Sequence, residues 1–265
     1  MSDTYEVFAV KYANHGPRSA ALNFIDGDPH EPSQPLDFYV WAVANKDRIV
    51  VVDTGFDEAM AKRRERTILK PVPEALKAAG FAPDRVNDVI ITHLHYDHSG
   101  NYDAFPNARY HLQDCEMAFA TGRCMCDEKM RIAFEADDVT ALVRKVYAGR
   151  MTFHDGEDQV APGITVHHIG GHSKGLQAVR VKTARGDVVL ASDGIHLYEH
   201  FEQNKVFPIT YNAEEAIAGY GKLKALASSV KHIVPGHDPK VLERYPAPNA
   251  ALKGWVARLD VEPNA

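Results

Sequence analysis

The chain has 265 residues, of which 45% are hydrophobic, and this length suffices for one large core or two modest ones. Its formal net charge is -6, and no long run of Lys or Arg interrupts this acidic balance, which argues against a nucleic-acid partner. The start of the chain lacks a secretory signal pattern, and no segment approaches the roughly 18 apolar residues of a membrane span. We therefore expect a soluble, cytoplasmic protein with no membrane partner.

Strand-like segments dominate the first part of the chain. The Asp-, Pro- and Gly-rich stretch 23–35 is expected to be a loop, and the turn at 45–47 joins two strands into a hairpin. A short helix is predicted at 73–80, because a proline stands at its first position and a glycine at its end. The predicted strands are 5–12, 38–44, 48–52 and 89–91.

The segment after residues 89–91 is the most informative part of the chain. Residues 92–100 read THLHYDHSG, an H-x-H-x-D-H cluster formed by His93, His95, Asp97 and His98. Imidazoles and a carboxylate this close together are hard to explain by packing, and the set suits zinc, cobalt, iron or manganese. The sequence therefore predicts a metal centre at the C-terminal end of a strand.

The middle of the chain is expected to be helical after a strand at 109–112. Residues 114–149 have the charge density and the apolar spacing of helices. The residues that would form their buried face are Ile132, Val139, Leu142, Val143 and Val146. Cys124 and Cys126 form a C-x-C pair, but no second pair completes a four-sulfur site, so we interpret them as ordinary thiols.

The last part of the chain returns to a strand pattern. Asn212 and Glu215 have capping-box spacing, which predicts a helix from 213 to about 229 with Ile217, Tyr220, Leu223 and Leu226 on one side. The predicted strands are 163–169, 176–183, 187–191 and 231–235. This order of elements favours two sheets packed together with helices outside.

Three further metal-ligand residues stand where a strand pattern stops. They are His172, Asp193 and His237, and each has a glycine as a near neighbour. Glycine allows the backbone to turn sharply and to approach a site closely. Each of these positions alone would be an ordinary loop residue, but together with the H-x-H-x-D-H cluster they indicate one centre.

The combined motifs resemble those of the metallo-β-lactamase superfamily from Asp53 to His237. The resemblance implies an α+β fold, an αββα sandwich of two mixed β-sheets flanked by helices. It implies a single metallo-hydrolase domain over residues 1–265, with a helical insertion at about 114–150. It also implies two divalent metal ions between the sheets, with zinc as the default and cobalt, manganese or iron as alternatives.

The resemblance assigns a role to each metal-ligand position of the family, and this chain has a suitable side chain at every one of them. The first metal would be held by His93, His95 and His172. The second would be held by Asp97, His98 and His237, with Asp193 bridging both. Asp53 would hold a ligand histidine in place.

Within the superfamily the chain is most similar to the N-acyl homoserine lactonase (quorum-quenching lactonase) family. The similarity rests on residues 92–101, on Ala191-Ser192-Asp193 and on Gly236-His237-Asp238. Glyoxalase II adds a C-terminal helical domain, which we do not expect here because only 28 residues of the sequence follow His237 (265 minus 237). Flavodiiron proteins carry Glu where this chain has His95 and add a flavodoxin domain.

The lactonase resemblance implies a dinuclear-metal hydrolase that opens a lactone ring by attack of a metal-bridging hydroxide. The substrate would be an N-acyl homoserine lactone or another small lactone, and Asp97 would also carry a proton to the leaving oxygen. Alternatives are an acyl hydrolase for thioesters, β-lactams or cyclic amides, and a non-catalytic binding module. We disfavour the module, because structural zinc sites are closed and usually rich in cysteine. The oligomeric state is left open, with a homodimer as one option.

One position departs from the lactonase pattern. The family has a substrate-orienting tyrosine three residues after the bridging aspartate, and this chain has His196 there, with Tyr198 two residues further on. In a loop either side chain could face the site, whereas in a helix or strand the two would point in different directions. We favour His196, and the substitution leaves the substrate open beyond acyl homoserine lactones.

Overall fold

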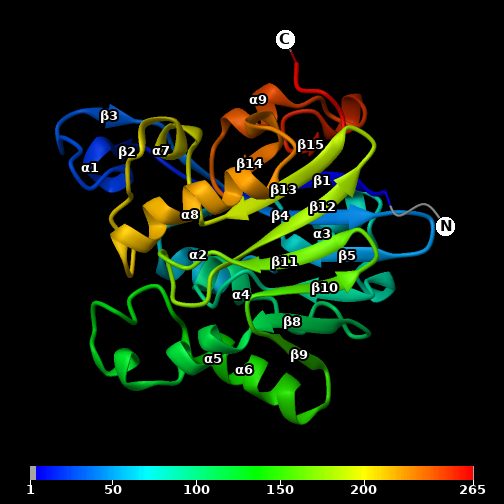
Figure 1. Cartoon of the computed structure of the whole chain (residues 1–265), viewed down its shortest axis with the longest axis horizontal. Helices are drawn as coiled ribbons and strands as arrows, with labels where there is room; N and C mark the ends of the chain where they lie inside the picture. Colours follow the sequence, from blue (N-terminus) through cyan, green and yellow to red (C-terminus); the bar gives the residue numbers. More distant parts are fainter. Residues whose placement is uncertain (1–3, 265) are drawn as a thin grey trace.

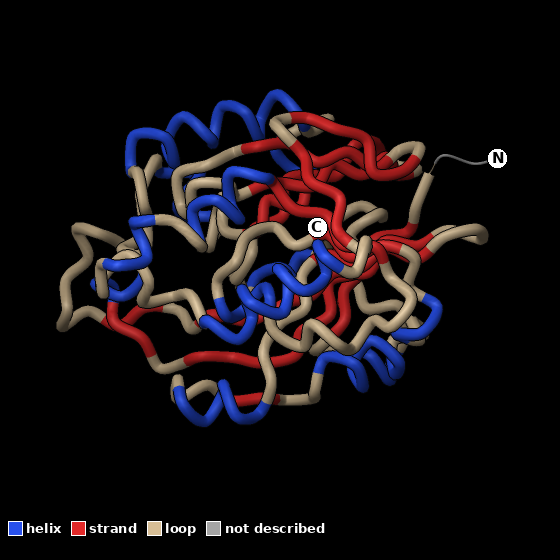
Figure 2. Tube along the Cα trace, turned by 90° about the horizontal axis from the view of Figure 1, so that it is seen from below, coloured by secondary structure: helices blue, strands red, loops and turns tan. Residues whose placement is uncertain are grey.

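The computed structural model describes residues 4–264. Two β-sheets lie face to face, and helices cover their outer sides (Figure 1, Figure 2). Both sheets contain parallel and antiparallel strand pairs, so the predicted α+β sandwich of two mixed sheets is confirmed. Within residues 4–264, no helix is long and apolar enough to cross a membrane.

The larger sheet contains the strand that precedes the histidine cluster. Its strands are β1 (Glu6–His15), β4 (Leu36–Ala44), β5 (Ile49–Val52), β6 (Thr67–Ile68), β7 (Asp88–Ile90), β8 (Arg109–Gln113), β9 (Met151–His154) and β15 (Val256–Arg258). Their order is β15-β1-β4-β5-β7-β8-β9, with β6 paired to β1. Strands β5, β7, β8 and β9 run parallel, so their C-terminal ends lie at one edge of the sheet.

The strands of the smaller sheet lead to the other predicted ligands. Its strands, in spatial order, are β10 (Glu157–Ala161), β11 (Ile164–His168), β12 (Gln177–Thr183), β13 (Gly186–Ser192) and β14 (Ile233–Pro235). A separate ribbon pairs β2 (Arg18–Ser19) with β3 (Pro32–Ser33), so the stretch predicted to be a loop carries a short strand at its end. Strands β9, β10 and β15 were not predicted. All three are edge strands of their sheets, and edges need fewer apolar residues.

The helices are short. They are α1 (Ala20–Asn23), α2 (Glu58–Arg63), α3 (Val72–Ala78), α4 (Tyr96–Ser99), α5 (Asp114–Ala120), α6 (Ala136–Tyr147), α7 (Tyr198–Gln203), α8 (Ala213–Leu226) and α9 (Lys240–Arg244). Short 3-10 turns lie at 83–85, 123–126, 230–232 and 250–252. The region predicted as a helical insertion contains α5, one such turn and α6.

Three details of the helix predictions are wrong. Ile132 is exposed, because it lies in a turn before α6 begins and so does not share that helix's buried face. Ile217 is exposed because the buried face of α8 runs through Ala216, Gly219, Tyr220 and Leu223. The predicted helix start is confirmed, since the Asn212 side chain accepts a hydrogen bond from the Glu215 N–H. The reciprocal half of a capping box is absent, because the Asn212 N–H donates to the Gly171 carbonyl, and α8 ends at Leu226 rather than near 229.

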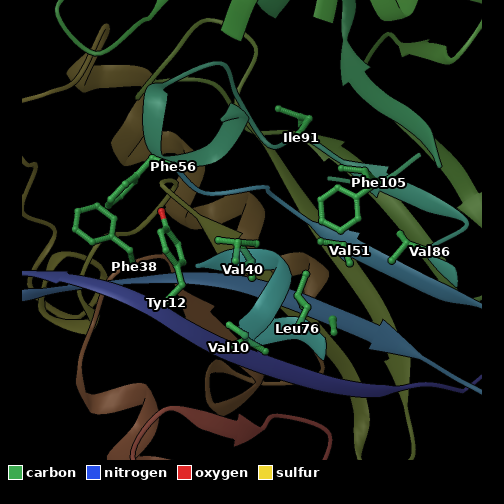
Figure 3. Close-up of a cluster of buried hydrophobic side chains, with 14 of the residues drawn as sticks. Val10, Tyr12, Phe38, Val40, Val51, Phe56, Leu76, Val86, Ile91 and Phe105 are labelled. Atoms are coloured by element: carbon green, nitrogen blue, oxygen red, sulfur yellow. The ribbon is translucent and has the colours of Figure 1, made fainter. Parts of the chain in front are cut away.

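Alternating side chains of the larger sheet serve two apolar cores. In β1, Val7 and Ala9 point into the layer between the sheets, whereas Phe8 and Val10 point to the outer face. Figure 3 shows that outer core, where Val10 and Leu76 lie among other apolar side chains. Because both faces are covered, the strands that lead to the predicted ligands are rigidly supported.

Candidate metal centre

The predicted ligands all lie just beyond the C-terminal ends of strands. The H-x-H-x-D-H cluster follows β7 and runs into α4, and His172 lies in the loop after β11. Asp193 follows β13 directly, and His237 follows β14. The fold therefore brings together side chains that are far apart in the sequence, at one edge between the sheets.

Two buried groups of ligand atoms form there. His93, His95 and His172 make up the first group, and Asp97, His98, Asp193 and His237 make up the second. Within each group the ligand atoms lie within 4.8 Å of one another. All the residues predicted to bind metal are thus in one of two adjacent groups.

Asp193 lies between the two groups. Its Oδ1 atom is 2.9 Å from His237 Nε2 and 3.2 Å from His98 Nε2, both in the second group. Its Oδ2 atom is 3.2 Å from His172 Nε2 in the first group. Each oxygen faces a different group, which is the arrangement that a bridging carboxylate requires.

Hydrogen bonds fix the orientation of three ligand imidazoles. The Nδ1 atoms of His172 and His237 contact the backbone carbonyls of Ile209 and Asp37 at 2.6 and 2.9 Å. A carbonyl only accepts, so both Nδ1 atoms donate to it, and both Nε2 atoms face the centre. His98 Nδ1 is held in the same way by Asp53 Oδ2 at 2.7 Å.

The donor set fits divalent cations. His98 Nε2 and Asp193 Oδ1 are buried and lie 3.2 Å apart, but neither has a hydrogen bond of normal geometry among the described residues. Such atoms are costly to bury unless something binds them, and a cation satisfies a lone pair of either kind. Imidazoles and carboxylates without thiolates suit borderline or hard divalent ions.

The two groups differ in their electrostatics. Burial lowers the pKa of His93 and His95 well below the ordinary value, so both are neutral imidazoles. Burial alone would raise the pKa of Asp193, but His237, His98 and the nearby His196 together lower it well below its usual range. The second group therefore contains an ionised Asp193, and the nearby carboxylates in turn raise the pKa of His98 and His237.

A comparison of the sequence with known protein families agrees with this fold and this set of predicted ligands. The sequence profile of the Metallo-beta-lactamase superfamily matches residues 35–237, which is more than half of the chain. The chain belongs to this superfamily. Membership confirms the predicted class of metal-dependent hydrolase.

Relatives of this superfamily member include lactonases. It is 28% identical over 225 residues to an N-acyl homoserine lactonase of Bacillus thuringiensis, with 78% of this chain and 84% of the relative covered. It is 29% identical over 173 residues to the N-acyl homoserine lactonase AttM of Rhizobium radiobacter, with 63% of each covered. The crystal structure of a quorum-quenching N-acyl homoserine lactone lactonase has the same fold, with a TM-score of 0.74 and 22% identity over 90% of this chain and 94% of that chain.

Beneath the predicted metal ligands, Asp53 organises a network of polar groups. Asp53 Oδ1 accepts the Thr92 N–H at 2.7 Å, and Oδ2 contacts the hydroxyls of Thr92 and Ser192 at 2.9 and 3.3 Å. Asp53 and Ser192 have φ angles of 61° and 46°, a conformation that side chains with a Cβ rarely adopt. The contact of Asp53 with His98, one of the predicted ligands, is the one that the predicted role of Asp53 requires.

Glu116 is a supporting residue that the sequence did not reveal. It lies in α5, is fully buried, and accepts the N–H groups of Leu94 at 2.9 Å and Gly175 at 2.7 Å. Its carboxylate thus ties the loop of His93 and His95 to the loop of His172. Burial raises its pKa. A glutamate in a charged helical segment is normally interpreted as a surface residue, so no signal in the sequence marked it.

The structure separates the two candidates that follow Asp193. His196 lines the cavity above the ligands, its Nε2 atom is 2.8 Å from Asp193 Oδ2, and its ring stacks on Phe207 at 3.5 Å. Tyr198 begins α7 and points into the apolar core between the sheets, under the guanidinium of Arg244 at 3.6 Å. We therefore remove Tyr198 from the candidate site, because the start of the helix directs it away from the cavity.

The ligand cluster opens on two adjoining cavities of about 220 Å³ each. Both are lined by His95, His172 and Ile209. The residues that distinguish the second cavity are Phe119, Lys129, Met130, Phe134, Thr210 and Tyr211. Ligand pockets commonly have about 300 to 1,000 Å³, so either cavity alone suits a small substrate or part of one.

Proposed function

We propose that this protein is a dinuclear-metal hydrolase that opens a lactone ring. The observation that carries the proposal is the position of Asp193, with one oxygen facing each ligand group at the floor of a small cavity. The lactonase relatives of Bacillus thuringiensis and Rhizobium radiobacter support lactones as the substrate class. An acyl homoserine lactone is one candidate substrate among small lactones.

The proposed ligands are those predicted from the sequence. His93, His95 and His172 would hold one ion, Asp97, His98 and His237 the other, and Asp193 would bridge them. Two divalent ions, zinc by default, would supply an acidified water and an electrophile for the lactone carbonyl. The hydrogen bonds at Nδ1 of His98, His172 and His237 orient these rings so that their Nε2 atoms face the centre.

The side chains of this chain then have distinct roles in the proposed reaction. Asp97 lines the cavity and lies 3.7 Å from His237 Nε2, so its carboxylate can take a proton from the attacking water. The same carboxylate can return that proton to the leaving oxygen, which stays tethered after ring opening. His196 contacts Asp193 and forms part of the cavity wall, so we assign it to orienting the carboxylate and the substrate.

A substrate panel tests this function. Metal-loaded and chelator-treated protein would be compared on γ-lactones, β-lactams and acyl-glutathione. We expect lactone hydrolysis by the metal-loaded protein only. Turnover of β-lactams or of the thioester with inert lactones would replace the proposed substrate class by one of the other acyl hydrolase classes.

Two broader predictions stay open to direct measurement. Sedimentation of the purified protein tests the suggested homodimer. Fractionation of cells that express the protein tests the predicted cytoplasmic location.

A further inference from the structure

The mouth of the first cavity carries an unusual group of basic side chains. His15 lies at the end of β1, Arg18 lies in β2, and Arg66 precedes β6. All three line the same cavity as the ligands His95 and Asp97. We call these three residues the cationic rim.

Among the described residues, neither of the two rim arginines has a carboxylate partner. Within residues 4–264, the polar contacts of Arg18 are with the Asn23 side chain at 2.6 Å, the Leu22 carbonyl and His15 Nδ1 at 2.7 Å. Those of Arg66 are with the Tyr96 hydroxyl, the Arg64 carbonyl and His15 Nε2.

A third arginine of the same wall provides the contrast. Arg64 also lines the cavity, but its guanidinium is neutralised by Glu135 at 2.6 Å. A half-buried guanidinium normally has such a partner, because burial of an unpaired charge is costly. The cavity wall therefore holds two guanidiniums that are not paired with any carboxylate of residues 4–264.

The His15 imidazole lies between the two guanidiniums and cannot accept a hydrogen bond from both, so N–H donors outnumber acceptors in the rim. His15 Nδ1 faces Arg18 at 2.7 Å, and His15 Nε2 faces Arg66 at 3.1 Å. A neutral imidazole offers one lone pair, so one of these contacts places an N–H group against another N–H group. Burial and the charges of Arg66 and Arg18 lower the pKa of His15 to about 4, so at neutral pH the ring does not add a third charge.

A hydrogen bond connects the rim to the segment that carries two of the predicted metal ligands. Arg66 Nε donates to the Tyr96 hydroxyl at 3.1 Å, and Tyr96 is the residue between His95 and Asp97. The aliphatic and aromatic side chains of Leu22, Leu36 and Phe207 line the cavity with them. A lactone ring bound above the ligands would thus have the cationic rim on one side and these apolar side chains on its other sides.

We propose that the cationic rim binds a negatively charged substituent, a carboxylate, on the lactone substrate. This inference rests on the proposed lactonase function and narrows its substrate class. A guanidinium binds a carboxylate through two parallel N–H donors, which matches the surplus of donors here. The lactone carbonyl would face the ligand cluster while the carboxylate reaches Arg18 and Arg66.

A matched pair of substrates tests the inference. A γ-lactone that carries a carboxylate would be compared with its methyl ester, which has the same ring and no charge. Because a hydrogen bond to a charged group contributes roughly 1.5 to 3 kcal/mol, we expect kcat/KM to favour the carboxylate by about tenfold or more. In Arg66→Gln and Arg18→Gln this preference should fall to within about twofold, with turnover of the ester retained.

Control variants separate the rim from general effects. Arg63→Gln removes an exposed guanidinium that pairs with Glu135 outside the cavity, and it should leave the preference unchanged. Arg66→Lys keeps the charge without the two-pronged geometry, so it should retain part of the preference. Circular dichroism and metal content would show that each variant is folded and loaded.

The outcomes distinguish this inference from the proposed function. If the wild-type protein hydrolyses both lactones equally, or if the preference survives in both glutamine variants, the rim proposal is overturned and the lactonase proposal stands. If neither lactone is hydrolysed, the lactonase proposal fails, and calorimetry decides about the rim. Metal-loaded protein should then bind glutarate at least about tenfold more tightly than its monomethyl ester, and equal affinities would overturn the rim as an anion site.

Discussion

The floor of the cavity consists of the predicted metal ligands, and its mouth carries the cationic rim. The two regions differ in how the polar atoms of their side chains are satisfied. At the floor, His98, His172 and His237 are buried, and the Nδ1 atom of each has a defined acceptor. At the mouth, Arg18 and Arg66 are half-buried and have donors in excess. In the proposed enzyme, cations would therefore satisfy the floor, whereas an anion would satisfy the mouth. Substitutions at the floor should therefore abolish the reaction, and those at the mouth should change its selectivity.

The largest effect is expected for Asp193→Ala. The variant removes the carboxylate that faces both ligand groups, so metal content should fall and kcat/KM for a lactone should drop by at least about a thousandfold. Circular dichroism should show a retained fold. Near-normal turnover with full metal content would contradict the assignment of Asp193 as the bridge. Elemental analysis and steady-state kinetics provide both readouts.

A smaller effect is expected one layer below the ligands, for Asp53→Asn. Asparagine has one acceptor oxygen, so it cannot serve both the Thr92 N–H and His98 Nδ1. Substitutions of groups that orient metal ligands typically cost about 10- to 100-fold in metal affinity, and we expect excess metal to restore turnover. The matched control is Asp103→Asn, which changes an exposed carboxylate that pairs with Lys145. Equal metal affinity in both variants would show that Asp53 does not position His98.

At the boundary between floor and mouth, His196→Phe should have an intermediate effect. It removes the hydrogen bond to Asp193 Oδ2 but keeps a ring that can stack on Phe207. We expect kcat/KM to fall by about tenfold at unchanged metal content. His30→Phe, at an exposed position, serves as the control. Loss of a metal equivalent would instead make His196 a ligand, because its Nε2 also lies close to His172 and Asp193.

The smallest effect is expected at the mouth, in the pH dependence of stability. The pKa of His15 is lowered to about 4 in the folded protein, from an ordinary value of 6.5, by burial and by Arg66 and Arg18. The neutral ring therefore stabilises the fold above pH 6.5, and this contribution is lost as the pH falls toward 4.

Chemical unfolding of wild-type protein and His15→Gln would measure this loss. Because His15 is only half-buried, we expect the free energy of unfolding of the wild type relative to the variant to fall by about 1 kcal/mol between pH 7.5 and 4.5. A difference that does not change with pH would show that the ring is not held neutral by its two arginine neighbours.

The floor was predictable from the sequence, and the reason lies in its local pattern. His93, His95, Asp97 and His98 stand within one short motif after an apolar strand, and the structure places them at the C-terminal end of β7. His172, Asp193 and His237 were recognisable because each follows a strand pattern. The two sheets were predictable for the same reason, since their inner strands are runs of apolar residues.

The mouth and the supports of the floor were not predictable. Arg18 and Arg66 are typical surface residues in a sequence, and only the fold brings them to one cavity. Glu116 was hidden because its partners are backbone N–H groups of distant loops. The edge strand β10 was missed because most of its side chains are exposed, so it lacks a clear apolar pattern. In each case the deciding contact is long-range, and a local pattern does not contain it.

Metal titration of chelator-treated protein tests the central claim most directly. Hydrolysis of a γ-lactone would be followed as zinc is added in known equivalents. The account predicts no turnover without metal and a rise that saturates at about two equivalents per chain, one for each ligand group. Full lactone hydrolysis by the metal-free protein, or saturation at a single equivalent, would contradict it.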